Sequence, residues 1–351
     1  MEELLAHQKF KTLTPDQVAS FMKHGFLRIP GAIPSDKCDW WARDVWTRLG
    51  VDPNDKATWG DKDRVHMAKH NYIAADEIAP TAWAGICELL GGEDRIAEEG
   101  KYWVDSFIVN LGTEAGEGKP FEPRELNNWH VDGDFYQHFL DSPEQALLVI
   151  PCWSDVVEGG GATVICTEGP KRIGQLLFDN PQGLNPAMQS RDTPAVKSSY
   201  LGEQSPYKKA VRQSADDSFF EMTGNKGDVI LMHPLTLHSA SNNAKRAIRI
   251  ITNPPVSLRE PFQFDREDPT QYSLVELKTM QDLGGPAKLK GWKITGPREF
   301  VVPDRLKLQN EQLKHENARL EALGRQTAAM SQMPRMMLGE QRPQQNAAVV
   351  G

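Results

Sequence analysis

The sequence predicts an α+β protein in which a group of helices is followed by a β-sandwich or barrel. Up to about residue 100, apolar side chains recur at helical spacing between capping signals and Gly stop signals. From Lys101 onwards, short runs of aromatic and β-branched residues are separated by polar turns. Helices and strands that are segregated along the chain are typical of α+β folds, and many short strands are typical of sandwiches and barrels.

The composition limits the class of function. Of the 351 residues, 39% are hydrophobic and 25% are charged, as in ordinary globular proteins. The net charge of -8 argues against a protein that binds nucleic acid through its phosphates. No apolar run reaches the roughly 18 residues of a membrane span, and the acidic start lacks the apolar core of a secretory signal. The four cysteines are scattered without metal-like or redox-like spacing. These features predict a cytoplasmic protein with reduced cysteines and no nucleic-acid or membrane partner.

The clearest helix start lies near the N-terminus. Thr14 can cap a helix that has Pro15 at its first position and Gln17 at the capping-box position, and Gly25 is a typical stop. Residues 26–29 then read as a short strand. The remaining elements expected before residue 101 are a flexible start over 1–12 and helices over 35–50 and 81–90.

Two histidines, His66 and His70, stand four residues apart in this helical part. On a helix they would share a face, as zinc ligands can. The metalloprotease pattern requires Glu after the first His, and Met67 occupies that position. We therefore interpret both as ordinary surface or core histidines.

The second part of the chain consists of apolar strands joined by turns and one long polar segment. A helix is expected over 173–178, and the polar, Pro-containing stretch 180–218 is typical of a functional lid or a disordered insertion. The expected strands are 102–111, 146–153, 162–166, 227–234 and 246–252.

The most informative motif is His130-Val131-Asp132, a His and an Asp separated by one apolar residue. Side chains alternate along an extended strand, so His130 and Asp132 point to the same side. An imidazole and a carboxylate that converge can chelate a divalent metal, and a distant second His would complete a 2-His-1-carboxylate triad of the kind that holds Fe(II). By itself, His-x-Asp is common and indicates only a polar strand end.

Two histidines could supply the third ligand. His233 and His238 are five residues apart, and an odd spacing places them on opposite faces of a regular strand. At most one of them can therefore join the pair. His238 stands next to a polar turn, whereas His233 ends an apolar run and is typical of a hydrogen-bonded core histidine.

In combination, these motifs resemble the phytanoyl-CoA dioxygenase-like family of Fe(II)- and 2-oxoglutarate-dependent oxygenases. The resemblance extends over about residues 13 to 256. It implies a double-stranded β-helix, the cofactor Fe(II), the cosubstrates 2-oxoglutarate and O2, and a small-molecule substrate. The matching stretches are Leu13-Thr14-Pro15, Gly25-Phe26-Leu27, Pro30-Gly31-Ala32-Ile33-Pro34, His130-x-Asp132, Gly227-Asp228-Val229, His233-Pro234, His238 and a following Arg.

The resemblance also assigns roles to single residues. It selects His238 as the third iron ligand beside His130 and Asp132. It implies that Arg249 pairs with the distal carboxylate of 2-oxoglutarate, with Arg246 as the alternative, and that Trp153 lies beside the cosubstrate. A buried guanidinium needs an anion, and Arg249 interrupts an apolar strand, which favours it over Arg246.

Two family features are missing, and neither touches the iron ligands. Ala240 replaces a Ser that is often found two residues after the distal His. The stretch 167–170 replaces a Pro-Gly-Ser-His sequence. Because of these departures, the substrate of well-known members does not carry over.

The sequence thus predicts one oxygenase domain over 13–302, which is helical over 13–100 and has its β-helix core over 101–256. A C-terminal helix over 303–325 and a disordered tail over 326–351 follow. Leu306, Leu313 and Leu320 are spaced seven apart in the helix, too few repeats for a coiled coil, so we expect a surface helix packed on the domain. The alternative to an oxygenase is a non-catalytic binding protein that forms a homodimer through this helix.

Overall fold

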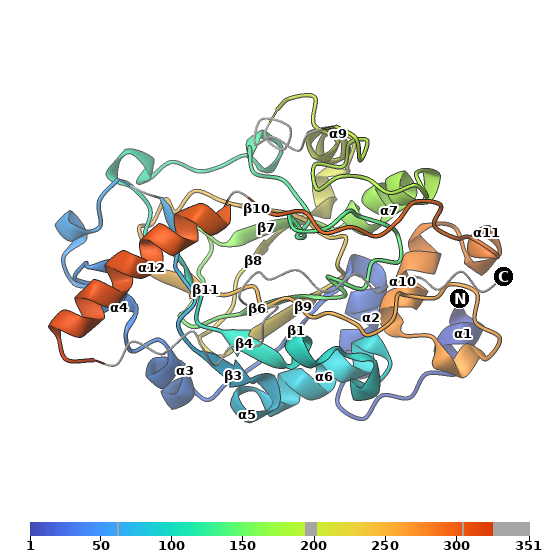
Figure 1. The fold of residues 1–351 in the computed structure, drawn as a ribbon, viewed down its shortest axis with the longest axis horizontal. Coiled ribbons are helices and arrows are strands. Elements are labelled where there is room, and N and C mark those ends of the chain that lie inside the picture. Colours follow the sequence, from blue (N-terminus) through green and yellow to red (C-terminus); the bar gives the residue numbers. More distant parts are fainter. Residues whose placement is uncertain (62, 194–201, 304, 326–351) are drawn as a thin grey trace.

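The computed structural model describes residues 1–61, 63–193, 202–303 and 305–325, and it shows a mixed fold of helices around antiparallel sheets (Figure 1). Among the described helices, none combines the length and apolarity that crossing a membrane requires. The helices are α1 (Glu2–Ala6), α2 (Pro15–His24), α3 (Ser35–Trp41), α4 (Val45–Leu49), α5 (Ala75–Ile78), α6 (Pro80–Leu90), α7 (Gly169–Asp179), α9 (Pro206–Arg212), α10 (Leu274–Asp282), α11 (Pro286–Leu289) and α12 (Arg305–Ala322). The strands are β1 (Phe26–Ile29), β2 (Arg64–His66), β3 (Tyr72–Ala74), β4 (Tyr102–Val104), β5 (Ile108–Asn110), β6 (Leu148–Pro151), β7 (Thr163–Cys166), β8 (Phe219–Met222), β9 (Val229–Met232), β10 (Leu237–Ala240) and β11 (Arg249–Ile251).

Antiparallel strands form a long sheet, a short sheet and a separate two-stranded ladder of β3 and β4. The strands β1-β9-β6 form one ladder and β11-β5-β2 form another, and a bridge between Cys152 and Ile251 joins the two along the edges formed by β6 and β11. The short sheet has the order β10-β7-β8, and His130 extends its edge through a bridge to His238. In Figure 1 the short sheet lies above β6, β9 and β1.

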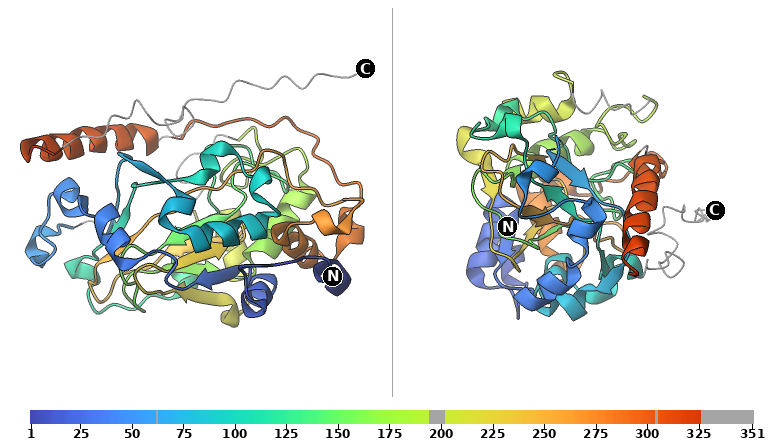
Figure 2. Two further views of the ribbon diagram at one scale, coloured as in Figure 1. Left: turned by 90° about the horizontal axis from the view of Figure 1, so that it is seen from below. Right: turned by 90° about the vertical axis from the view of Figure 1, so that its left-hand side faces the viewer.

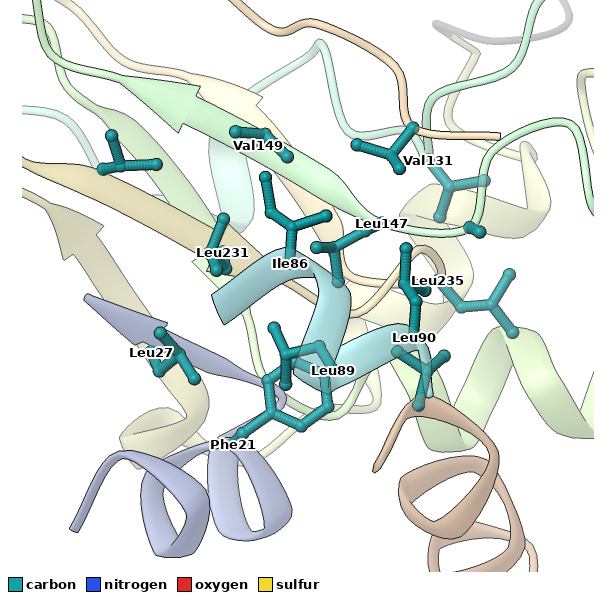
Figure 3. Packing of buried hydrophobic residues seen from close by; sticks show 14 of the residues in the cluster. Phe21, Leu27, Ile86, Leu89, Leu90, Val131, Leu147, Val149, Leu231 and Leu235 are labelled. Carbon is teal, nitrogen blue, oxygen red and sulfur yellow. The ribbon is translucent and has the colours of Figure 1, made fainter. Parts of the chain in front are cut away.

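Strand alternation divides the apolar side chains of the long sheet between two cores. On one face they pack against the short sheet, and on the other they pack against helices. The inter-sheet cluster contains Ile108, Leu148, Ile150, Cys152, Val156, Ala162, Ile165, Met222, Ile230, Met232 and Ile251. Their strand neighbours Val149 and Leu231 point the other way, toward α2 and α6, where Phe21, Ile86 and Leu89 meet them (Figure 3).

The first predicted helix and its strand are confirmed. Thr14 and Gln17 form a capping box at the start of α2, and Gly25 ends the helix with a left-handed φ of 77°, which only Gly adopts without strain. The strand β1 spans the predicted residues and pairs with β9. The helix predicted over 81–90 is α6 and begins one residue earlier.

Three predicted elements are divided in the structure. The helix predicted over 35–50 is two helices, α3 and α4, with a turn between them. The strand predicted over 102–111 is two strands in different sheets, β4 and β5. The segment 180–218 contains helix α9 in its described part, and residues 194–201 lie outside the described residues.

The two ends of the chain also contain helices. Residues 1–12, expected to be flexible, include α1, and the backbone N–H groups of Lys11, Thr12 and Leu13 donate to the carboxylate of Glu88. The predicted C-terminal helix is present as α12, which lies along the outside of the molecule and contacts α4 (Figure 2). The tail predicted to be disordered, 326–351, lies outside the described residues.

We expect the inter-sheet cluster to be a main source of stability. Ile230 in β9 is fully buried in it, so Ile230→Ala should cost about 2–5 kcal/mol of unfolding free energy through lost burial and the cavity left behind. The measurement is urea unfolding followed by circular dichroism. Val157→Ala, at a site with 40% exposure, is the control and should change stability by less than about 0.5 kcal/mol. Equal stabilities for the two variants would contradict this view of the core.

Candidate metal centre and cosubstrate pocket

His130, Asp132 and His238 come together at one point. Each offers one ligand atom, and these three atoms lie within 4.8 Å of one another, the one such group among the described residues. The Nε2 atoms of both histidines are 3.5 Å from Oδ1 of Asp132. Two imidazoles and one carboxylate form the donor set of a 2-His-1-carboxylate metal site.

Backbone pairing explains why the two imidazoles meet. His130 and His238 exchange backbone hydrogen bonds of 3.0 and 2.9 Å, although they are far apart in sequence. In β10, His238 lies opposite Ile165 of β7, whose side chain belongs to the inter-sheet cluster. Both rings therefore project into the space between the sheets. The extended backbone expected around Asp132 is limited to His130, because Asp132 lies in a bend.

Backbone carbonyls fix which nitrogen of each imidazole is free. Nδ1 of His130 lies 2.7 Å from the carbonyl oxygen of Asn128, and Nδ1 of His238 lies 3.1 Å from that of Thr236. A carbonyl only accepts, so Nδ1 must carry a hydrogen, and Nε2, which faces Asp132, is the nitrogen left to bind a metal once it has lost its proton. Metal-binding histidines are typically oriented in this way, by a hydrogen bond from the ring nitrogen that does not bind the metal.

The charges at the triad favour a cation. Burial raises the pKa of Asp132, but the charges and hydrogen bonds of His238 and His130 outweigh it and hold this pKa well below its usual value. Burial lowers the pKa of His238, and Asp132 raises it by more. The carboxylate thus favours positive charge on the imidazole of His238, and a bound dication would replace that proton charge.

Arg249 lies in the same inter-sheet space with no acidic partner. It is 1% exposed, its Nε donates to the carbonyl of Gly161 at 2.8 Å, and its Nη1 is 3.3 Å from the carbonyl of Ile108. Among the described residues, no carboxylate lies within 4 Å of it. Burial, assisted by the charge of Arg64, lowers its pKa to about 10. A buried guanidinium without an anion is costly, so this position suits an anionic ligand.

Arg246, the alternative anchor, already has partners. Its Nη1 is 3.9 Å from a carboxylate oxygen of Glu117, and its guanidinium lies 5.5 Å from the ring centroid of Trp59. Its Nη2 donates to the carbonyl of Lys56 at 3.2 Å. Between the two candidates, the structure leaves only Arg249 with an unmatched buried charge.

Trp153, which the resemblance places beside the cosubstrate, has its side chain on the face of the long sheet opposite to Arg249, so its role as a cosubstrate contact stays a prediction. Its neighbour Cys152 belongs to the inter-sheet cluster, so the indole points to the opposite face of the sheet. There it packs against Trp41, Trp103 and Phe107, and its Nε1–H donates to Thr252. The residue type matches the family, but the strand register directs the Trp153 side chain away from the space between the sheets.

Sequence reasoning missed two residues near the triad. The side-chain amide of Asn253 donates to Oδ2 of Asp132 at 3.2 Å and orients the carboxylate. His66 lies in β2 rather than on a helix, opposite Ile108, so its ring faces the inter-sheet space, whereas His70 lies in a separate buried cluster. His66 would have stood out only if strand β2 had been predicted, and the polar residues around this short strand gave no such indication.

The structure separates His233 from the metal centre. His233 follows β9, is 1% exposed, and its Nε2 is 2.8 Å from the hydroxyl of Thr279. Its Nδ1 accepts from the backbone N–H of Leu235 at 3.1 Å, so Nε2 is the donor to Thr279. Burial lowers its pKa to about 3. The interpretation of His233 as a core histidine agrees with this geometry.

Comparison with known proteins identifies the family. The model of the phytanoyl-CoA dioxygenase family matches residues 21–251. The chain belongs to this family. None of the curated protein sequences matches the chain.

Solved structures with a similar arrangement include three from microorganisms. EvdO2 from Micromonospora carbonacea var. aurantiaca, complexed with 2-oxoglutarate, is 14% identical over 76% of this chain and 99% of its own, with a TM-score of 0.39. HygX from Streptomyces hygroscopicus, with nickel, 2-oxoglutarate and hygromycin B bound, is 12% identical over 72% and 90%, with a TM-score of 0.36. The GlcNAc Inducible Gene 2 protein from Candida albicans is 11% identical over 92% and 85%, with a TM-score of 0.42.

Family membership and the triad together support Fe(II) and 2-oxoglutarate as cofactor and cosubstrate. The donor set fits Fe(II), since both Nε2 lone pairs and one carboxylate oxygen converge. The buried Arg249 fits a carboxylate. The three metal ligands and Arg249 face the same space between the sheets, as a cosubstrate that chelates the metal at one end and carries a carboxylate at the other requires.

The two histidines of the 233–238 stretch should behave differently on substitution. His238→Ala removes a metal-facing nitrogen, so we expect loss of tight Fe(II) binding, measured by anaerobic titration. His233→Ala, the matched control, should keep Fe(II) binding but lose on the order of 1–3 kcal/mol of stability, because a buried hydrogen bond is lost. Loss of Fe(II) binding in His233→Ala with retention in His238→Ala would exchange the two roles.

Proposed function

We propose that this protein is an Fe(II)- and 2-oxoglutarate-dependent dioxygenase that hydroxylates or otherwise oxidises a small molecule, and that its facing sheets are those of a double-stranded β-helix. The observation that carries the proposal is the convergence of His130, Asp132 and His238 in the same inter-sheet space as an unpaired, buried Arg249. The location of the protein in the cytoplasm stays a prediction from the sequence.

Different residues would bind the metal and the cosubstrate. His130, Asp132 and His238 would hold the iron, while Asn253 keeps the Asp132 carboxylate in place. Arg249 would bind the distal carboxylate of 2-oxoglutarate by two parallel hydrogen bonds. When bound, Fe(II) and 2-oxoglutarate would supply the electrons that activate O2, the oxidant of the substrate C–H bond. Because a carboxylate occupies the third ligand position, no position is left there for a halide, which argues against halogenation.

The alternative, a non-catalytic protein that dimerises through its C-terminal helix, gains no support from α12. Of the α12 side chains that the structure describes, only Glu316 and Leu320 are buried, and the helix contacts α4 of its own chain. Its buried residues are thus already used within the chain. The prediction of a surface helix packed on the domain fits this arrangement.

Anaerobic titration with Fe(II) and then 2-oxoglutarate tests the function. The chelate gives a charge-transfer absorption, and admission of O2 should then consume 2-oxoglutarate slowly even without a substrate. Asp132→Ala should abolish both signals, because it removes the anionic ligand. Asp216→Ala, a change at an exposed carboxylate, is the control. A folded Asp132→Ala protein with normal turnover would exclude iron catalysis at this site.

Arg249→Ala should weaken 2-oxoglutarate binding strongly. Without the guanidinium the distal carboxylate would be desolvated and unpaired, a loss of roughly 3–5 kcal/mol, or about two to four decades in the dissociation constant. Fe(II) affinity should hardly change, because the Arg does not contact the triad.

The matched control is Arg246→Ala, which removes a guanidinium that already pairs with Glu117 and should have little effect. The absorption titration measures both dissociation constants. The reverse ranking would move the anchor to Arg246, and two neutral substitutions would argue against 2-oxoglutarate.

A further inference from the structure

A buried ionic cluster lies outside the metal centre and joins four separate parts of the chain. Glu316 comes from α12, Arg48 from α4, Asp105 from the break between β4 and β5, and His70 from the segment after β2. Their exposures are 4%, 2%, 3% and 3%. We call these four residues the Glu316 cluster. Residue 316 lies well beyond residue 251, where the family match ends.

The contacts within the cluster are close and directional. Nε of Arg48 donates to Oε2 of Glu316 at 2.8 Å, and Nη1 donates to Oδ2 of Asp105 at 3.1 Å. Nε2 of His70 donates to Oε2 of Glu316 at 2.9 Å. Burial raises the pKa of Glu316, but hydrogen bonds from His70, Arg48 and a backbone N–H outweigh it and lower this pKa, so the carboxylate stays charged.

The cluster holds the backbone just after β2. The N–H of Ala68 donates to Oε1 of Glu316 at 3.0 Å, and its carbonyl accepts from Nη2 of Arg48 at 2.6 Å. Ala68 is two residues beyond His66, the last residue of β2. In the described sheets β2 pairs only with β5, so it is an edge strand of three residues that depends on contacts beyond its own ladder.

β2 presents two side chains to the inter-sheet space that holds the triad and Arg249. Arg64 lies opposite Asn110, which lies opposite Arg249, so both guanidiniums are on the same face of the sheet. Arg64 has no ion pair among the described residues. His66 is exposed at the end of β2, and it is close enough that the charges of Arg64, Arg249 and the triad act on its ring.

We propose that Glu316 is a positioning residue for the oxygenase site: it fixes β2 so that Arg64 and His66 face 2-oxoglutarate beside Arg249. The helix α12, outside the matched family region, thereby completes the cosubstrate pocket. This inference rests on the proposed function.

The character of α12 agrees with a positioning role. Its described side chains bury little apolar surface, because only Leu320 accompanies Glu316 in the interior. Apolar residues would hold a helix on a domain at lower desolvation cost than a charged cluster does. Hydrogen bonds to both polar groups of Ala68 fix the position of one peptide, which apolar contacts do not do.

The test is the affinity of the full-length, Fe(II)-loaded protein for 2-oxoglutarate, measured anaerobically by charge-transfer absorption. Glu316→Ala should raise this dissociation constant about fivefold or more, while the Fe(II) dissociation constant stays within about twofold. The KM for 2-oxoglutarate should rise more than kcat falls. Glu316→Gln keeps the shape of the side chain and should give a smaller rise in the same direction. Glu311→Ala, at an exposed position of the same helix, is the control and should match the wild type.

A double-mutant cycle shows whether the effect passes through β2. Arg64→Ala should itself weaken 2-oxoglutarate binding, and adding Glu316→Ala should then weaken it little further. Fully additive effects, or a folded Glu316→Ala and Glu316→Gln pair with wild-type affinity for 2-oxoglutarate, would overturn the positioning role alone. Absence of the absorption from the wild type would overturn the proposed function and this inference together.

Discussion

The burial of the long sheet on both faces is the constraint on which the site depends. Helices cover one face and the short sheet covers the other, so successive residues of each strand belong to different cores. A shift of one residue would exchange every pair of neighbours between those cores. In that case Arg249 would point at the helices and Ile250 would take its place between the sheets. The apolar packing of the strands therefore fixes the direction of the functional side chains.

The metal centre is built at the end of that apolar interior, with polar partners for each ligand. Backbone carbonyls hold the Nδ1–H groups of His130 and His238, and Asn253 holds Asp132, so the donor atoms do not need to rearrange to meet a cation. The buried charges also balance in the proposed complex, since a dication, the carboxylate of Asp132, a dianion and the guanidinium of Arg249 sum to zero, and Arg64 is partly exposed to solvent. Balanced charge reduces the cost of placing these groups in a space enclosed by apolar side chains.

In the C-terminal helix, the deepest contact is not made by the residues that the sequence pattern indicated. Leucines spaced by seven suggested either a dimer seam or a packed surface helix. In the structure Leu320 is buried, Leu313 is only half-buried, and the side chain of Leu306 lies outside the described residues. The deepest contact is made by Glu316, a residue that pattern reasoning treats as exposed. Its partners are distant in sequence, so no local spacing could have indicated it.

Local features of this protein were determined by its sequence alone. The capping box at Thr14, the stop at Gly25 and the isolated Arg249 in an apolar strand each depend on residues a few positions apart, where backbone geometry dictates the outcome. The tertiary structure decided which side chains share a space. It turned Trp153 away from the site and brought His66 toward it, while His70 joined the Glu316 cluster. These outcomes depend on strand register and on contacts between residues far apart in the chain, and such pairings are chosen by the packing of whole sheets and helices, not by neighbouring residues.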